Sequence, residues 1–294
     1  FFNTVIYTGT GSSNAITGVG FQPDLVWVKD RSNAYDHGLF DAVRGVTKDL
    51  RSNTNIAEST NANSLTAFGA DGFTVGSHAI INGNNNNYAS WNWKANGAGS
   101  ANTSGTITST VSANTTAGFS IATWTGITGS GTIGHGLGGV DCIITKNTNS
   151  SRDWYFWNKS MAYNTRLELN NTEAFTTGTD NMTQLPDATK IYWDDSTQNN
   201  GNGENYVGYF FQEKTGYSKF GSYTGNGNAD GTFVYTGFKP AMIILKNTET
   251  AKDWNIWDNK RGFNGVNKLL YPSLNNSEGS GEYIDLLSNG FKLR

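Results

Sequence analysis

The run Asp24-Leu25-Val26-Trp27-Val28-Lys29 is one of three related segments in this 294-residue chain. The other two are Asp141-Cys142-Ile143-Ile144-Thr145-Lys146 and Ala241-Met242-Ile243-Ile244-Leu245-Lys246. Each is a short apolar run closed by a lysine, which has the length and composition of a buried β-strand. Their recurrence predicts an internally repeated protein with about a hundred residues in each copy.

Two further motifs keep a nearly constant distance from these runs. An aromatic residue followed by Thr-Gly opens each copy, at Tyr7-Thr8-Gly9, Trp124-Thr125-Gly126 and Tyr223-Thr224-Gly225. An aspartate seven positions after each lysine begins a second aromatic strand, at Asp36, Asp153 and Asp253. Polar turn residues lie between the lysine and the aspartate, so each pair of strands is predicted to form an antiparallel hairpin.

The rest of the pattern predicts an all-β fold made of tandem antiparallel β-sandwich repeat units. Short strands are bounded by Gly, Asn and Ser clusters, helical periodicity is scarce, and the chain has only four prolines. The first unit is expected at residues 1–97, a Gly/Ser/Thr/Asn-rich linker at 98–117, the second unit at 118–215 and the third at 216–294. Residues 55–68 lack a clean apolar stripe and are expected to form a loop or a short turn.

The third unit is expected to lack its last strand. Tyr88-Ala89-Ser90-Trp91 in the first copy matches Tyr206-Val207-Gly208-Tyr209 in the second, and the counterpart in the third would lie beyond Arg294. A sandwich without that strand has an open edge, which invites pairing with another segment. Either a longer polypeptide or a neighbouring chain is expected to complete the sheet.

Composition argues against two classes of partner. The net charge is −3 and the longest basic run is the pair Lys260-Arg261, so no nucleic-acid partner is expected. The apolar runs have strand length and fall short of the ~20 residues of a membrane-spanning helix, so no membrane insertion is expected. Nine tryptophans and 13% aromatic residues indicate a chain that folds. The single cysteine, Cys142, has apolar neighbours and is expected to be buried.

No catalytic constellation stands out. The carboxylates are scattered, and no pair is marked as the acid and base that a glycosidase needs. His37, His78 and His135 are too dispersed for a metal site or a triad, and His37 occupies a tryptophan position of the repeat, which indicates packing. The chain is therefore predicted not to be an enzyme and to need no cofactor, with a polysaccharide-degrading enzyme as the least favoured alternative.

One loop has half of a calcium-binding pattern. Asn226, Asn228 and Asp230, followed by Gly231, match the opening of a calcium loop, but the twelfth position is Gly237 in place of the glutamate that binds the ion through both oxygens. A turn between strands is the favoured interpretation, and calcium binding is the weaker alternative.

An aromatic row is the best candidate for ligand binding. Phe40, Trp157 and Trp257 occupy one position of the hairpin strand, and apolar side chains precede each of them and face the opposite way. Such a strand is either buried on both faces, which is the favoured interpretation, or presents the row to a sugar or a partner. The Asn-rich loops at 82–87 and 199–204 could also bond sugar hydroxyls, or simply make turns.

Several motifs together resemble a known repeat. They are the Tyr-Thr-Gly opening, Gly20-Phe21-Gln22-Pro23-Asp24 with the strand that follows, Asp41-x-x-Arg44-Gly45, Asp71-Gly72-Phe73, Trp91-Asn92-Trp93-Lys94 and Gly134-His135-Gly136-Leu137-Gly138. They are similar to a repeat of uncharacterised function in structural proteins of marine tailed phages. The likeness covers nearly the whole chain and is looser in copies two and three.

The resemblance implies a place in the virion, as a tail fibre, a tail appendage or a capsid-decorating protein. It also implies concanavalin A-like or SPRY-like sandwiches and brings no catalytic residues. We therefore expect a virion structural protein whose partners are other virion proteins or copies of itself, with contact to a host cell-surface glycan as a further expectation. A carbohydrate-binding lectin or adhesin is the alternative.

Overall fold

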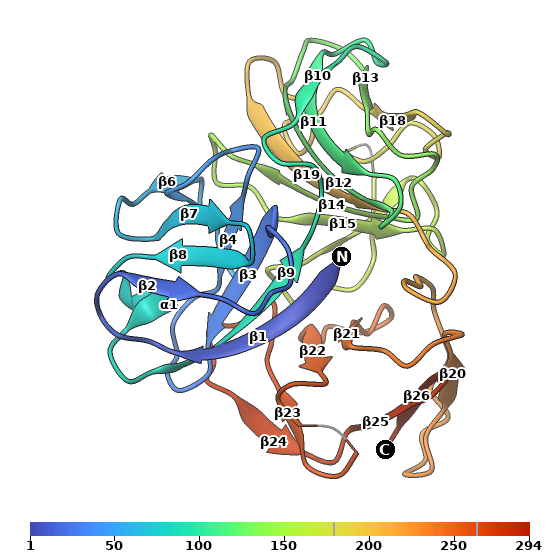
Figure 1. The fold of residues 1–294 in the computed structure, drawn as a ribbon. Coiled ribbons are helices and arrows are strands. Elements are labelled where there is room, and N and C mark those ends of the chain that lie inside the picture. The colour runs from blue at the N-terminus through green and yellow to red at the C-terminus, as the bar shows by residue number, and fades with distance from the viewer. Residues whose placement is uncertain (179, 263) are drawn as a thin grey trace.

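The computed structural model describes residues 1–178, 180–262 and 264–294, and it is built from antiparallel strands (Figure 1). Within these residues the single helix is the one-turn α1 (Ala79–Asn82). The all-β prediction is therefore confirmed. No helix in the described part of the chain is long and apolar enough to cross a bilayer.

The first copy has two main sheets. The first sheet, in spatial order, consists of β1 (Phe2–Thr8), β9 (Asn87–Trp93), β3 (Leu25–Asp30) and β4 (Gly38–Asp41). The second consists of β2 (Asn14–Ile16), β8 (Gly72–Val75) and β7 (Leu65–Gly69). A small pair is formed by β5 (Lys48–Asp49) and β6 (Ser59–Thr60). Apolar side chains from both main sheets, Val26, Phe40 and Phe73 among them, form one buried cluster.

The second copy repeats this order within a larger sheet. Its eight strands, in spatial order, are β10 (Ser100–Asn102), β11 (Ser109–Asn114), β12 (Phe119–Thr125), β19 (Asn205–Phe211), β14 (Cys142–Asn147), β15 (Tyr155–Asn158), β16 (Thr165–Glu168) and β17 (Thr176–Thr177). A separate pair is formed by β13 (Gly131–Gly134) and β18 (Lys190–Trp193). Here β12, β19, β14 and β15 take the places of β1, β9, β3 and β4.

The third copy has fewer strands. One sheet consists of β20 (Phe233–Tyr235), β26 (Gly290–Leu293) and β25 (Ile284–Leu287). Two hairpins are formed by β21 (Met242–Leu245) with β22 (Asn255–Asp258), and by β23 (Asn267–Leu269) with β24 (Gly279–Gly281). Among the described residues, no strand takes the place that β9 and β19 hold in the other two copies.

The predicted hairpins are present with the same register in all three copies. Val26 lies opposite Phe40, Ile143 opposite Trp157, and Ile243 opposite Trp257. In each hairpin the lysine-terminated strand is paired with the aromatic strand that follows it. The three segments picked out by residue spacing thus form hairpins with equivalent backbone pairing.

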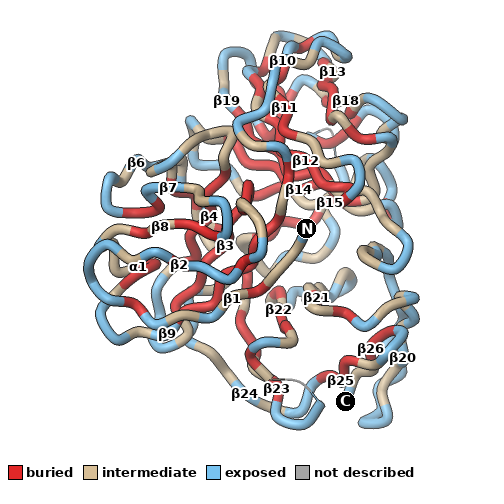
Figure 2. The backbone as a smooth tube through the Cα atoms, in the orientation of Figure 1, coloured by how far each residue is buried: buried red, intermediate tan, exposed pale blue. Residues whose placement is uncertain are grey.

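The three copies surround a shared core. The largest buried cluster joins Trp91 of the first copy, Tyr209 of the second and Ile256 of the third. In Figure 1 the blue, the green-to-yellow and the orange-to-red strands form three lobes about this centre, and Figure 2 shows its strands as mostly buried. The copies therefore pack around a common centre and do not form a straight row.

The structure differs from two local expectations. The expected linker, residues 98–117, contains β10 and β11, and β11 pairs with β12 along its whole length. The buried side chains of Ile107 and Val111 anchor this segment, although hydroxyl and amide residues dominate its composition. The expected loop at 55–68 contains β6 and most of β7, because Leu65 is fully buried in the core of the first copy.

Candidate functional site

The aromatic row is buried. Phe40, Trp157 and Trp257 have exposed fractions of 0, 1 and 6%. Phe40 and Trp257 lie in core clusters of their own copies, whereas Trp157 belongs to the shared core, as do Leu39 and Ile256 on the opposite side of the strand. As placed, the three rings offer no face to a sugar, and the hairpin strand is buried on both sides.

The asparagines of the Asn-rich loops hydrogen-bond to the backbone of the protein. Asn82 is fully buried, and its Oδ1 accepts the backbone N–H of Thr10 at 2.9 Å. In the second copy, Oδ1 of the buried Asn200 accepts the backbone N–H of Ile127 at 3.0 Å. Both amides thereby fasten the loop before β9 or β19 to the turn that follows the Thr-Gly opening. Their polar atoms serve the fold.

The half-calcium pattern also forms a turn. Oδ1 of Asn226 and Oδ1 of Asn228 accept backbone N–H groups two residues farther along the chain, and Asp230 is paired with Lys292. The described residues contain no cluster of three or more His, Cys, Asp or Glu side chains suited to a metal ion. Calcium binding at this loop thus stays a prediction with no further support from the geometry.

The lysines at the ends of the repeated strands, of which Lys29 and Lys146 are fully buried and Lys246 is partly buried, are held by carbonyl groups. Lys29, Lys146 and Lys246 each donate from Nζ to the carbonyl oxygen of the next residue, at 2.6, 2.9 and 2.8 Å. Burial lowers the pKa of Lys29 and of Lys146 to about 8. A lysine of lowered pKa can act in catalysis. Here each ammonium is occupied by carbonyl acceptors at the end of its strand.

One carboxylate in the first copy is perturbed. Asp49 is buried, neither of its side-chain oxygens accepts a hydrogen bond, and burial raises its pKa to about 6. Its nearest cation is Arg51, at 3.8 Å. Arg51 pairs more closely with Asp36, at 2.7 Å. Asp36 and Asp49 thus share one arginine, and Asp36, the only other carboxylate on it among the described residues, is held in an ion pair.

Three hydrogen bonds at equivalent positions join the copies in a closed ring. Trp154 donates its indole N–H to the carbonyl of Arg51 at 2.8 Å, and Trp254 donates to the carbonyl of Glu168 at 2.9 Å. The third bond joins Nε2 of His37 to the carbonyl of Tyr271 at 2.9 Å. Copy two thus contacts copy one, copy three contacts copy two, and copy one contacts copy three. We call these the ring contacts.

His37 acts in the ring as a tryptophan would. Trp27 donates its own indole N–H to Nδ1 of His37 at 2.8 Å, so the network assigns the proton of the neutral ring to Nε2. That N–H then donates to Tyr271, as the indole N–H groups of Trp154 and Trp254 do to their acceptors. His37 therefore packs in the core, as expected, and also makes a hydrogen bond to Tyr271 that the sequence did not reveal.

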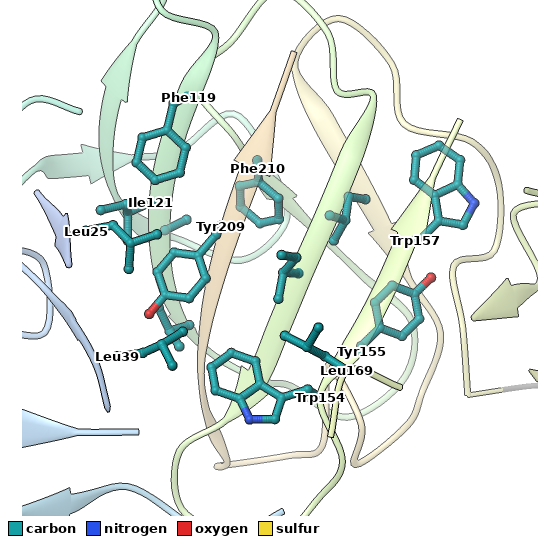
Figure 3. Close-up of a cluster of buried hydrophobic side chains, with 14 of the residues drawn as sticks. Leu25, Leu39, Phe119, Ile121, Trp154, Tyr155, Trp157, Leu169, Tyr209 and Phe210 are labelled. Atoms are coloured by element: carbon teal, nitrogen blue, oxygen red, sulfur yellow. The ribbon is translucent and has the colours of Figure 1, made fainter. Parts of the chain in front are cut away.

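A second set of contacts between copies is incomplete. Tyr209 donates to Oδ2 of Asp41 at 2.9 Å, and Trp91 donates to Oδ2 of Asp258 at 3.0 Å. Figure 3 shows Tyr209 directed toward the first copy, beside Trp154. The matching acceptor position in the second copy is Asn158, which accepts hydrogen bonds from Ser160 in its own turn. Among the described residues, the third copy has no strand equivalent to β9 and β19 from which an aromatic side chain could reach Asn158.

A large groove marks the place of that strand. It measures about 1520 Å³ and lies between residues 216–225 on one side and residues 241–247 on the other. Phe156, Asn158 and Met161 of the second copy also line it. We call it the third-copy groove. Residues 221–230 at its rim are all exposed, as Figure 2 shows, whereas β1 and β12, which open the other two copies, are paired strands.

The edge of β21 that faces the groove is unpaired. In the first copy β3 pairs with both β4 and β9, and in the second β14 pairs with both β15 and β19. Among the described residues, β21 pairs with β22 alone. Ile244 and Leu245 are only partly buried, although their counterparts Trp27 and Val28 are fully buried. The third-copy groove is the candidate functional site.

The chain matches, over residues 1–294, a family described as Domain of unknown function (DUF7483). No curated protein and no solved structure matches it.

Proposed function

We propose, given that the chain belongs to the DUF7483 family, that it is a structural protein of a phage particle that forms part of a tail fibre, a tail appendage or the capsid surface. The observation that carries the proposal is the use of the repeat's signature residues. The aromatic, amide and lysine positions that recur in the sequence hold strands, turns and neighbouring copies together. A chain whose repeated polar groups serve its own packing suits a building block.

We further propose that each copy is an antiparallel β-sandwich, with boundaries at residues 1–97, 118–215 and 216–294, and that the third is incomplete. The placement of a buried cluster between two sheets in the first copy supports this division. The strands at 98–117 extend the sheet of the second sandwich. The closed contacts among the copies favour a compact, rigid module over an extended chain of separate domains.

The proposal includes no enzymatic activity. Asp49, the one carboxylate of the first copy whose pKa is strongly shifted, shares Arg51 with Asp36, which pairs with the arginine more closely. Contact with a host glycan would have to use residues other than Phe40, Trp157 and Trp257, because these rings are buried. Partners are proposed to be other virion proteins or further copies of this chain.

The test is to locate the polypeptide. Mass spectrometry of purified particles should find it in a fixed ratio to the major capsid protein, and antibody labelling should place it on the tail or the capsid surface. Its recovery only as a free protein from cell lysate, with none in purified particles, would overturn the proposal. A glycan array probed with the folded chain, with and without calcium, should remain silent, and a saturable sugar signal would favour the lectin alternative.

A further inference from the structure

The third-copy groove is larger than an ordinary ligand site, and its lining includes the counterparts of two strands. Its volume of about 1520 Å³ exceeds the ~300–1,000 Å³ of an ordinary small-molecule pocket. Its lining includes the third copy's counterparts of the strands that flank β9 in the first copy and β19 in the second. Residues 216–225 correspond to β1 and β12, and β21 corresponds to β3 and β14. The groove therefore fits a polypeptide strand better than a small ligand.

A glycine at the rim indicates that a loop comes with the strand. A Cβ on Gly9 would collide with the carbonyl oxygen of Gly83, and a Cβ on Gly126 with that of Gly201. Gly83 and Gly201 belong to the loops just before β9 and β19. The third copy keeps the same glycine, Gly225, yet nothing lies within 4 Å of a Cβ built there. Gly225 has the residue type that the absent loop requires.

We propose that the third-copy groove binds a β-strand of the repeat's own pattern, and that this strand follows β26 in the same polypeptide. The interval supports attachment in the same chain. Residues 76–86 separate β8 from β9, and residues 194–204 separate β18 from β19, which is eleven residues in both copies. Since β26 holds the place of β8 and β18, the same short connection leads from Leu293 into the groove.

The register of the other copies specifies the occupant. Opposite Met242 it carries an aromatic residue, as Trp93 lies opposite Leu25 and Phe211 opposite Cys142. Opposite Ile244 it carries the aromatic side chain that reaches Asn158, by analogy with Trp91 and Tyr209. Opposite Leu245 it carries a small residue, as at Ser90 and Gly208, and opposite Asn247 a tyrosine, as at Tyr88 and Tyr206.

The residues that would contact the aromatic side chain opposite Ile244 differ from those that contact Trp91 and Tyr209. Trp91 and Tyr209 each meet an Asp and Arg pair, Asp258 with Arg261 and Asp41 with Arg44. The second copy has Asn158 and Met161 at these positions. The amide of Asn158 can accept one hydrogen bond from an aromatic side chain, and the thioether of Met161 can pack against its ring. The groove therefore accepts its strand without a buried ion pair.

This inference does not rest on the proposed function, and the chain supplies its own probe. A synthetic peptide of residues 203–213 carries β19, and it should bind the full 294-residue chain in a one-to-one complex by calorimetry. A peptide of the same composition in shuffled order should bind at least tenfold more weakly. Failure of the peptide to bind a chain that circular dichroism shows to be folded would overturn the strand-binding site.

Crosslinking tests the register. With Ile244→Cys in the chain and Tyr209→Cys in the peptide, oxidised glutathione should convert the two thiols to a disulfide, because these positions lie directly opposite each other in the predicted pairing. Ile243→Cys is the matched control, since its side chain points to the opposite face of the strand. Equal crosslinking at 243 and 244 would contradict the register.

A chain with a tethered strand tests whether the strand that fills the groove belongs to the same polypeptide. A chain extended after Arg294 by a copy of residues 195–211 keeps the eleven-residue interval, and it should be monomeric, unfold at a higher temperature and no longer bind the peptide. An extension with shuffled strand residues is the control. Continued peptide binding by the extended chain would overturn attachment in the same polypeptide. Dimers of the original chain that the peptide dissociates would assign the strand to a second copy instead.

Discussion

The indole nitrogen of Trp254 lies 2.9 Å from the carbonyl oxygen of Glu168, 86 residues earlier in the chain, and donates a hydrogen bond to it. Both groups are buried, so neither can replace the other with water. Trp254→Phe should lower the free energy of unfolding by about 1–3 kcal/mol, because it leaves a buried carbonyl without its donor. Chemical denaturation would measure this.

The matched control is Trp257→Phe, because the buried Nε1 of Trp257 has no hydrogen-bond partner. The same loss of ring volume should cost less there. An equal loss of stability in the two variants would show that packing, and not the ring contact, accounts for the effect.

The hydroxyl of Tyr209 should contribute more to the free energy of unfolding than the hydroxyl of Tyr155. Tyr209 donates to the buried Asp41, whereas the buried hydroxyl of Tyr155 has no partner. Tyr209→Phe should cost ~1.5–3 kcal/mol, as expected for a hydrogen bond to a charged group, and Tyr155→Phe should be neutral or stabilising. Urea titrations of the two variants, side by side, would decide. Equal stabilities would mean that the contact between Tyr209 and Asp41 contributes nothing to the joining of copies one and two.

His37 should make stability depend on pH. Burial lowers its pKa well below 6.5, so below that pH the unfolded chain binds a proton that the folded protein does not. Its contribution to stability is complete above about pH 6.5 and is lost as the pH falls, at about 1.4 kcal/mol per pH unit. Asp49, whose pKa burial raises to about 6, acts in the opposite sense over ~pH 4 to 6. The measurement is therefore the slope of the free energy of unfolding against pH, compared between the wild type and His37→Gln. Identical slopes would refute the lowered pKa of His37.

Truncation of a ring in the aromatic row should destabilise the fold itself, so a loss of sugar binding in such a variant would not identify a binding residue. Trp157→Ala deletes a side chain that is 1% exposed, and such truncations cost ~3–5 kcal/mol. Thermal unfolding should show a large downward shift. A variant that keeps wild-type stability would mean that the ring is accessible in solution, and the sugar-binding alternative would regain its best candidate.

The Thr-Gly glycines should divide into two classes. Gly9→Ala and Gly126→Ala introduce a clash with a loop carbonyl, so both should destabilise the chain, while Gly225→Ala has open space around it and should be nearly neutral. In the extended chain with a tethered strand, Gly225→Ala should become as costly as Gly126→Ala. Thermal unfolding of the six proteins, three variants in each background, would check this, and a neutral Gly225→Ala in both backgrounds would argue against a loop at that rim.

Spacing in the sequence predicted much of the local structure. The three hairpins follow from an apolar run, a polar turn and an aromatic strand at a constant interval, which is information held within some twenty residues. Burial of the hairpin strand on both faces was also foreseeable, because adjacent positions such as Leu39 and Phe40 are both apolar.

The assembly of the copies was not foreseeable from the same signals. Each ring contact joins an N–H donor to a backbone carbonyl, and a carbonyl acceptor leaves no mark on residue type. The only trace was the recurrence of an aromatic ring with an N–H group at positions 37, 154 and 254. The strands at 100–114 were missed for another reason, because hydroxyl-rich β-strands and flexible linkers have similar compositions.

Closure of the ring also changes how the molecule should respond to damage. In an open array of repeats the terminal unit has one neighbour, and its loss leaves the remainder nearly as stable as before. Here every copy touches two others through the ring contacts, so removal of any one eliminates two of the three. Deletion of any one copy is therefore expected to destabilise the other two, and no copy should be as dispensable as the terminal unit of an open array.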